Sequence, residues 1–328
     1  MRPTSAQLGF AAAFALMVAV FTWRSDAFWH ASNLLNIATG CVVLLIVTLA
    51  MTAVVASGGI DLSVGVSLDF GAWFVIIAMV DWHLGWGPAI LTAVAVTLAV
   101  GALNGLLIAK AGVSPFLATL GVYFVGRSVQ QAGTNGGATV NFRQAPDAFH
   151  QFGVGSVAGV PVKVAIGLAL AVALWFFLTK TSHGRRIEAI GLQPEAARHI
   201  GIRVGAYTAL TYVVAAGLCA LAGAILTAQL RIFTPLAGFA YQTDAIAAVF
   251  LGAALSRAGR ASVPGSLAAV VFLATLSNGL DLAGLDFNVK VLVRGIVLVV
   301  ALAASFGLAR GAFGAGGRAL RPATLEAG

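Results

Sequence analysis

The chain has 328 residues, of which 60% are hydrophobic, 39 are glycine and only 9% carry a charge. Soluble domains have roughly 25% charged residues, so this composition excludes an ordinary soluble enzyme and a disordered chain. The formal net charge of +8 comes from Lys and Arg residues scattered between long apolar runs, and they form no basic stripe for nucleic acid. The class that remains is a polytopic membrane protein.

Long apolar segments recur along the whole chain. A bilayer core of about 30 Å is crossed by about 20 helical residues. Ten segments approach that length, the eighth being short enough for a half-span: 8–23, 38–56, 62–80, 88–109, 115–132, 162–179, 207–229, 244–256, 262–280 and 288–308. We therefore predict an all-α polytopic membrane protein with about ten transmembrane helices, including broken or half-spanning ones. The first is a retained helix rather than a signal peptide, because residues 22–26 offer no small-residue cleavage site.

The distribution of Lys and Arg predicts the orientation. Most of them fall on the same side of the predicted spans as the N-terminus, so the positive-inside rule predicts that both termini are cytoplasmic. The loop 133–161 then lies outside, and the loop 180–206, which has the densest charge, lies inside. We expect one transmembrane domain over 1–310 and a cytoplasmic tail over 311–328.

The sequence lacks the motifs that several enzymatic activities need. A phosphate-binding loop needs Gly-Lys before Ser or Thr, and none of the four lysines follows a glycine. There is no H-E-x-x-H zinc motif and no G-x-S-x-G nucleophile motif. The two cysteines, Cys41 and Cys219, lie in apolar segments and fit passive packing. We predict no catalytic residue, no ATPase site, no metal site and no cofactor.

The cytoplasmic loop 180–206 predicts two short helices. Gly191 is expected to stop the first, Pro194 suits the first position of the second, and Glu195 falls in its first turn. Gly201 closes this second helix, which presents a small apolar face made of Ala196, Ala197 and Ile200. Two interpretations remain open, an ordinary charged loop and a docking helix for a cytoplasmic motor.

This loop resembles the coupling loop of ribose-type sugar permeases of ATP-binding cassette importers, in the branched-chain amino acid/ribose permease superfamily. The family pattern is close to G-R-x-x-x-A-x-G-x-N-x-x-A-A-x-x-x-G-I. Gln193 stands where the family usually has Asn. The coupling loop that the resemblance implies consists of Gly184, Arg185, Glu188, Ala189, Gly191, Glu195, Ala196, Ala197, Gly201 and Ile202.

Other stretches are similar to the same family. Residues 57–65 read SGGIDLSVG, 115–121 read PFLATLG, 244–249 read DAIAAV and 278–280 read NGL. Residues 255–260 depart from the family, which is richer there in Gly and Ser. The matches run from about residue 34 to 300, and their order is more specific than any one of them.

The resemblance implies a transport subunit rather than an enzyme. Such a chain forms the pathway for a monosaccharide in a bacterial inner membrane, in contact with lipid and beside a second permease copy or paralogue. A periplasmic sugar-binding protein delivers the sugar, and separate cytoplasmic ATPase subunits use the ATP. The alternatives are a nucleoside permease of the same superfamily and a secondary transporter coupled to ions through Asp61, Asp69 or Asp244.

Polar and glycine residues at membrane depth are the candidates for a pathway or gate. Gly58 and Gly59 break an apolar run, and Asp61 either caps the helix that begins at Leu62 or belongs to a mobile break. The charges of Asp69 and Arg127 fall inside predicted spans, where they either pair with each other or contact substrate. The full candidate set is Gly58, Gly59, Asp61, Asp69, Asn104, Phe116, Thr119, Arg127, Asp244 and Asn278.

The order of polar residues suggests an internal repeat. Asp61, the NGL at 104–106 and Arg127 are followed by Asp244, the NGL at 278–280 and Arg294. Because Asp61 is expected inside and Asp244 outside, we hypothesise an inverted repeat of spans 2–5 and 7–10. Coincidence is the rival explanation, because the spacings differ between the two halves.

Aromatic residues within spans are candidates for stacking on a sugar. They are Trp73, Phe116, Tyr123 and Phe124. The alternative for each is packing in the core or contact with lipid.

Overall fold

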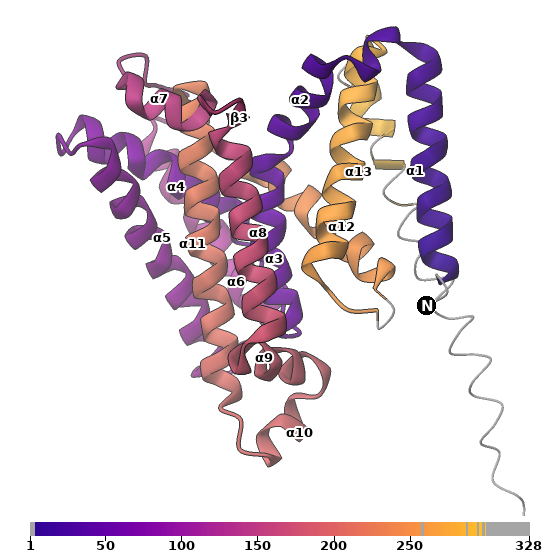
Figure 1. Ribbon diagram of the computed structural model, residues 1–328. Helices are drawn as coiled ribbons and strands as arrows, with labels where there is room; N and C mark the ends of the chain where they lie inside the picture. Colours follow the sequence, from indigo (N-terminus) through magenta and orange to yellow (C-terminus); the bar gives the residue numbers. More distant parts are fainter. Residues whose placement is uncertain (1–3, 257–258, 287, 294, 297–298, 300–328) are drawn as a thin grey trace, which may run out of the picture.

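The computed structural model describes residues 4–256, 259–286, 288–293, 295–296 and 299, and Figure 1 shows that it is built from helices. The long helices are α1 (Ser5–Arg24), α2 (Ala31–Gly40), α3 (Val42–Ala56), α4 (Val64–Val80), α5 (Trp86–Ala109), α6 (Pro115–Gly133), α8 (Val162–Lys180), α11 (Val204–Leu230), α12 (Gly238–Leu255) and α13 (Val263–Leu282). The short elements are η1 (Asp26–Trp29), α7 (Asp147–Val154), α9 (Ser182–Leu192), α10 (Pro194–His199) and the strands β1 (Val140–Asn141), β2 (Ser156–Val157), β3 (Val160–Pro161) and β4 (Ile232–Phe233).

The architecture confirms a helical polytopic membrane protein. In the described part of the chain, 7 helical segments are long and apolar enough to cross a bilayer, with α2 and α3 counted as one segment, and α4 is a shorter apolar helix. The helix α6 coincides with the fifth predicted span. The tenth predicted span, 288–308, lies largely outside the described residues, as does the predicted tail 311–328.

Local chemistry fixes where the helices begin. The Ser114 hydroxyl accepts a hydrogen bond from the Leu117 N–H, and Pro115 occupies the first turn of α6, where a missing N–H costs nothing. Ser262 accepts a hydrogen bond from the Gly265 N–H in the same way at the start of α13. These two caps explain why neighbouring spans are separated by loops of only a few residues.

The helix α3 is the centre of the core. It is apolar on all sides and buried over nearly its whole length, which is the pattern of a helix surrounded by other helices. It packs against α4, α8, α11, α12 and α13. Small residues let the backbones approach: a Cβ on Gly71 would lie 2.5 Å from the Ala220 Cα, and one on Gly101 would lie 2.6 Å from the Tyr212 carbonyl oxygen.

The packing pattern bears on the hypothesised inverted repeat. The helix α11 packs on α4 and α5, and α3 packs on α12 and α13, while α3 touches α11 and α4 touches α12. These are the pairings that a repeat of spans 2–5 and 7–10 requires. Because its last member falls largely outside the described residues, the repeat stays a prediction.

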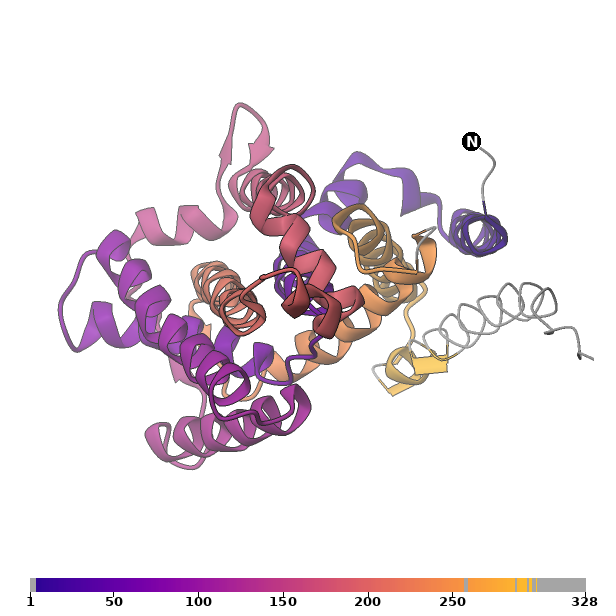
Figure 2. The same ribbon diagram turned by 90° about the horizontal axis from the view of Figure 1, so that it is seen from below.

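The two ends of the bundle differ in structure. The helices α9 and α10 lie at one end of α8 and α11, and α7 and β3 lie at the other end (Figure 1). The predicted outer loop 133–161 contains α7, the antiparallel pair of β2 with β3, and the strand β1, which pairs with β4 outside the loop. The sequence did not indicate these elements. The helix α1 stands at the edge of the bundle, with only Phe21 buried (Figure 2).

Candidate functional site

The loop between α8 and α11 forms the two predicted helices. The helix α9 begins where the Thr181 hydroxyl accepts a hydrogen bond from the Gly184 N–H at 3.0 Å. It runs through Gly191 to Leu192, so the prediction that Gly191 stops it was wrong by one residue. Pro194 occupies the first turn of α10, and Gly201 follows it with a φ of 80°, which glycine adopts without strain.

One face of this loop is packed firmly on the bundle. Ile187, Ile190 and Ala197 form a buried cluster with Tyr207 of α11. A Cβ on Gly191 would lie 2.2 Å from the carbonyl oxygen of Ala56, at the end of α3. This close backbone contact explains why a glycine stands there, and it joins α9 to the central helix.

The Gly58 turn meets the same loop. Gly58 has a φ of 84°, and a Cβ on it would lie 3.4 Å from the Gly191 Cα. Two residues that the sequence placed in different candidate sets therefore touch. The tight turn after α3 and the helix α9 form one structural unit.

The opposite face of the loop is exposed. Glu195 and Ala196 are exposed on α10, and the large apolar side chains of Leu192 and Ile200 are 54% and 75% exposed. Ala197, which the sequence assigned to the same apolar face, points into the buried cluster instead. The exposed face is a short apolar surface with charged residues of both signs, Glu195 and Arg198, on a packed base, which is a common form of docking surface.

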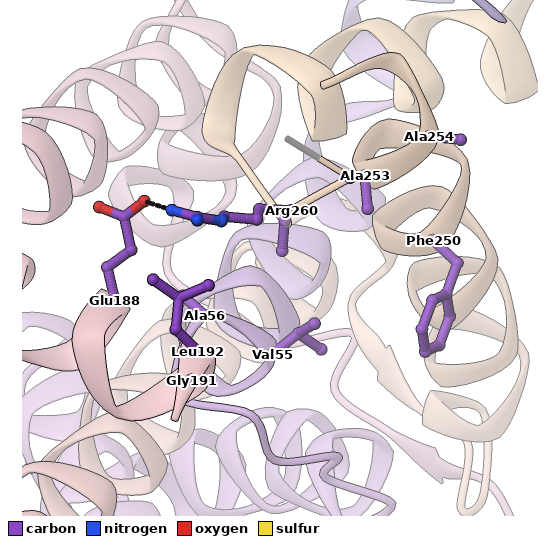
Figure 3. A pocket seen from close by; sticks show the side chains of 11 residues that line it. Val55, Ala56, Glu188, Gly191, Leu192, Phe250, Ala253, Ala254 and Arg260 are labelled. Atoms are coloured by element: carbon purple, nitrogen blue, oxygen red, sulfur yellow. Dashed lines mark hydrogen bonds and ion pairs between the residues drawn. The ribbon is translucent and has the colours of Figure 1, made fainter. Parts of the chain in front are cut away.

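An ion pair ties α9 to the loop between α12 and α13. The Arg260 guanidinium donates to the Glu188 carboxylate at 2.7 Å (Figure 3). Beside this pair lies a cavity of about 300 Å³ between α9, the end of α3 and α12. Its walls include Val55, Ala56, Leu192, Phe250, Ala253 and Ala254.

A polar cluster lies between the α3–α4 turn, α5 and α6. The Asp61 carboxylate accepts hydrogen bonds from the Ser63 N–H at 2.7 Å and the Ser63 hydroxyl at 2.6 Å. The Asn104 amide donates to the Ser63 hydroxyl at 2.7 Å, and the Thr119 hydroxyl accepts from the Leu62 N–H at 3.1 Å. The structure thus brings together Asp61, Asn104 and Thr119, all of them predicted and all buried.

This cluster corrects the expected role of Asp61. The helix α4 begins at Val64 rather than Leu62, and Ser63 occupies its N-cap position without a side-chain cap. Asp61 instead closes a local turn by accepting both hydrogen bonds from Ser63. Next to it, a Cβ on Gly59 would lie 2.5 Å from the hydroxyl oxygen of Tyr212, so Gly59 is needed for close packing.

Asp69 has a different partner from the one considered. Its carboxylate accepts a hydrogen bond from the Gly238 N–H at 2.8 Å, at the start of α12. The Gln130 side chain accepts one from the Leu236 N–H at 3.0 Å. Arg127 is exposed on α6, and within the described residues no ion pair joins it to Asp69, so the idea that these two charges pair was wrong.

The other pathway candidates are dispersed. The Asn278 amide donates to the Asn33 side-chain oxygen at 2.9 Å, between α13 and α2. Asp244 is half-buried on α12, and Phe116 is 52% exposed at the start of α6. The structure does not bring Asn278 or Asp244 to the Asp61 cluster, whereas Phe116 touches its edge, because its carbonyl oxygen accepts a hydrogen bond from the Thr119 hydroxyl at 3.4 Å.

The remaining loop residues have structural or surface positions. Gly184 is buried against the end of α8, Ala189 and Ile202 are half-buried, and Arg185 is exposed and donates to the Lys180 carbonyl oxygen. Sequence reasoning missed Ser63, Tyr207, Gln130 and Arg260. Two of them had a signal: Ser63 falls in the family-like stretch 57–65, and Arg260 in the segment 255–260 that departs from the family pattern.

Comparison with known proteins identifies the family. Residues 33–302 match the family described as branched-chain amino acid transport system / permease component. The chain belongs to this permease family. It is a transmembrane transport subunit of the ATP-binding cassette type and not the ATPase, as the sequence predicted.

Individual relatives cover nearly the whole chain. The ribose import permease protein RbsC of Bacillus subtilis (strain 168) is 37% identical over 88% of this chain and 88% of its own length. RbsC of Escherichia coli (strain K12) is 35% identical over 88% and 90%, and the D-allose transport system permease protein AlsC of the same strain is 30% identical over 88% of each chain. No solved structure matches the chain. The expected resemblance to ribose-type permeases is confirmed.

Proposed function

We propose that this permease imports ribose or a closely related monosaccharide across a bacterial inner membrane, with both termini cytoplasmic. A periplasmic binding protein would deliver the sugar, and separate ATPase subunits would drive transport through two copies of the permease. The relatives named for ribose and D-allose support a monosaccharide substrate. The family membership favours this function over the ion-coupled alternative.

The observation that carries the proposal is the exposed face of α9 and α10. Leu192, Ala196 and Ile200 are exposed where a membrane helix bundle ends, and nothing in the described chain covers them. Apolar side chains on a rigid, polar-rimmed surface favour docking of another protein. The buried side of the same loop is packed on α3 and α11, so a displacement of α9 would reach the transmembrane core.

The proposal is tested on the solubilised importer. Tagged permease is co-expressed with the ATPase and binding protein of the importer, purified in mild detergent, and assayed for retained ATPase and for ribose uptake in proteoliposomes. Replacing Ala196 with Arg puts a charged, bulky side chain on the exposed docking face. We expect loss of bound ATPase and at least a tenfold loss of uptake.

The matched control is Ser182→Arg, on an exposed position at the start of α9 and away from α10. It should retain both ATPase and uptake. Ala197 is unsuitable for this test, because a large side chain there would disrupt the buried cluster itself. Full ATPase binding and uptake in Ala196→Arg would refute the assignment of the docking surface, and uptake by the permease alone would refute the importer.

A further inference from the structure

Arg127 lies on α6 at a height near the middle of the membrane-spanning bundle. A Cβ on its neighbour Gly126 would lie 2.2 Å from Val66, and one on Gly133 would lie 2.1 Å from Trp73. The outer end of α6 is therefore level with Trp73, seven residues before α4 ends. At a rise of 1.5 Å per residue, Arg127 is about 18 Å from Pro115 at the inner end of α6 and about 20 Å below the outer end of α4.

The guanidinium at this depth is exposed. No described residue forms an ion pair or hydrogen bond with it, and α6 presents its side chain outward. A charge in the middle of a bilayer is disfavoured unless it meets water, a partner or a cavity. A position against lipid tails would therefore be unfavourable for Arg127, although α6 also exposes the apolar side chains of Val125 and Val129.

Aromatic residues lie near Arg127 along α6 and at the start of α12. Tyr123 and Phe124 lie one turn away on α6, and the rings of Tyr123 and Phe239 are 6.1 Å apart between centroids. Phe239 begins α12, and Thr243 is exposed one turn further along that helix. A Cβ on Gly65 would lie 2.7 Å from the Gly238 carbonyl oxygen, which places the start of α12 level with Arg127.

We call this set the α6–α12 face: Tyr123, Phe124, Arg127, Phe239 and Thr243. The exposed middle of α8 differs from the α6–α12 face because it carries no charge. Along the middle of α8 the exposed large side chains are Leu168, Val172, Trp175 and Phe176, and none of them carries a charge. That surface has the composition of a lipid-facing helix, so two sides of the molecule are built for two different environments.

We infer that the α6–α12 face lines the aqueous pathway and binds the sugar as it crosses. The exposed rings of Phe124 and Phe239 offer flat apolar surfaces for the C–H face of a sugar. The Arg127 guanidinium supplies several hydrogen-bond donors, and the Thr243 hydroxyl can donate or accept. This combination suits a neutral polyhydroxyl substrate. The identity of the sugar rests on the proposed function. The presence of water at this face does not depend on it.

The first experiment tests for water. Cysteine is placed at Arg127, Phe239 or Phe176 in a chain whose Cys41 and Cys219 are replaced by alanine. A small charged methanethiosulfonate reagent is added to both sides of membrane vesicles. We expect the cysteines at 127 and 239 to react at least tenfold faster than the one at 176, which is equally exposed on the lipid-facing side.

Slow reaction at all three positions would overturn the inference. So would slow reaction at 127 and 239 combined with a disulfide between copies at Phe239→Cys, which would make the face a dry contact between two permeases. This experiment needs neither ATPase nor sugar. Its failure is therefore distinguishable from failure of the importer assignment.

The second experiment tests for sugar binding. The assembled importer in proteoliposomes is assayed for the KM of ribose uptake. We expect Phe239→Ala to raise the KM about five- to tenfold, as loss of a stacking ring would, and Phe239→Trp to restore it. The control Phe176→Ala should leave the KM unchanged. An unchanged KM in Phe239→Ala at full expression would refute sugar binding at this face.

Discussion

At the scale of single residues, Asp69 is the clearest case of a membrane-buried charge with a structural task. Its carboxylate holds the Gly238 N–H at the start of α12. A helix N-terminus leaves such N–H groups without partners, and a carboxylate satisfies both the hydrogen bond and the helix dipole. Gln130 holds the Leu236 N–H two residues earlier. Together they fix the turn that leads into α12.

The Asp69 contact gives a direct prediction. Replacing Asp69 with Ala leaves a buried N–H unpaired, and we expect the free energy of unfolding to fall by about 1–3 kcal/mol. The Asn variant keeps an acceptor oxygen and should lose less than half as much. Thermal unfolding in detergent measures both, with expression as a second readout. Equal losses in the two variants, or a changed sugar preference at full expression in Asp69→Ala, would contradict the structural role.

Gly59 offers a test of close packing. A Cβ there would lie 2.5 Å from the hydroxyl oxygen of Tyr212, whose side chain is completely buried. We expect Gly59→Ala to destabilise the protein by about 1–3 kcal/mol, because the ring cannot move away. Removing the hydroxyl with Tyr212→Phe should rescue part of that loss.

The Gly59 and Tyr212 variants form a double-mutant cycle. Tyr212→Phe alone also loses a hydrogen bond to the Ile60 carbonyl oxygen, worth about 1 kcal/mol. The double variant should therefore be more stable than the sum of the two single losses predicts. Additive losses, measured by thermal unfolding, would show that the hydroxyl is not what excludes a side chain at position 59.

The sequence located most polar candidates but not their partners. It placed Asp61, Asn104 and Thr119 at membrane depth, and the structure joins them. It could not indicate that Ser63 lies between Asp61 and Asn104, or that Asp69 contacts the backbone of α12, 169 residues away in the chain. Their opposite charges suggested Arg127 as the partner of Asp69. A backbone N–H is an equally good hydrogen-bond partner for a carboxylate, but the sequence gives no signal for such a contact.

At the scale of elements, the helix α9 packs on the membrane core with one face and exposes the other. Its Gly191 abuts the end of α3, and its Glu188 binds Arg260 in the loop between α12 and α13. A partner that moved α9 would thus act on both halves of the bundle. The cavity beside the ion pair leaves room for such a movement.

The Glu188–Arg260 pair can be tested by exchanging charges. Both side chains are about half exposed, so the pair is worth only about 0.2–1 kcal/mol and its loss should hardly change stability. We expect Glu188→Arg, which opposes two like charges, to reduce sugar-stimulated ATPase activity about two- to fivefold. The double exchange Glu188→Arg with Arg260→Glu should restore it.

The control uses an ion pair within the same loop. Glu195 and Arg198 pair on α10, and in the part of the chain that the structure describes no ion pair joins either of them to another element. Because the exchange of Glu195 and Arg198 also alters the docking face, it should change ATPase binding rather than the stimulation of bound ATPase. Failure of the Glu188–Arg260 double exchange to restore stimulation would exclude a direct link between α9 and the α12–α13 loop.

Hydrophobic length was sufficient to predict most helices. The predicted spans 88–109 and 162–179 agree with α5 and α8 to within two residues. The sequence missed α2 and the break at Cys41, because an apolar run carries no signal for a bend. It also missed α7 and the four strands, of which β1 and β4 depend on pairing with each other across the chain. Short polar elements need tertiary contacts that periodicity does not record.

At the scale of the whole molecule, the chain presents different surfaces to different surroundings. The exposed middle of α8 is apolar, the α6–α12 face carries Arg127 at membrane depth, and α10 exposes the proposed docking surface at one end. The elements α7 and β3 lie at the other end of the same bundle (Figure 1). Such a division fits a subunit that works between lipid, water and a partner protein.

The orientation of the chain in the membrane can be measured. The excess of Lys and Arg predicts that α9 and α10 are cytoplasmic and that the β2–β3 pair is periplasmic. Ser156 in β2 and Ser182 in α9 are both exposed, and each can be replaced by cysteine in a chain lacking Cys41 and Cys219. A membrane-impermeant maleimide applied to spheroplasts should label Ser156→Cys and should label Ser182→Cys only after lysis. Because both positions are exposed, the reverse pattern would mean an inverted chain, and α10 could then not meet a cytoplasmic ATPase.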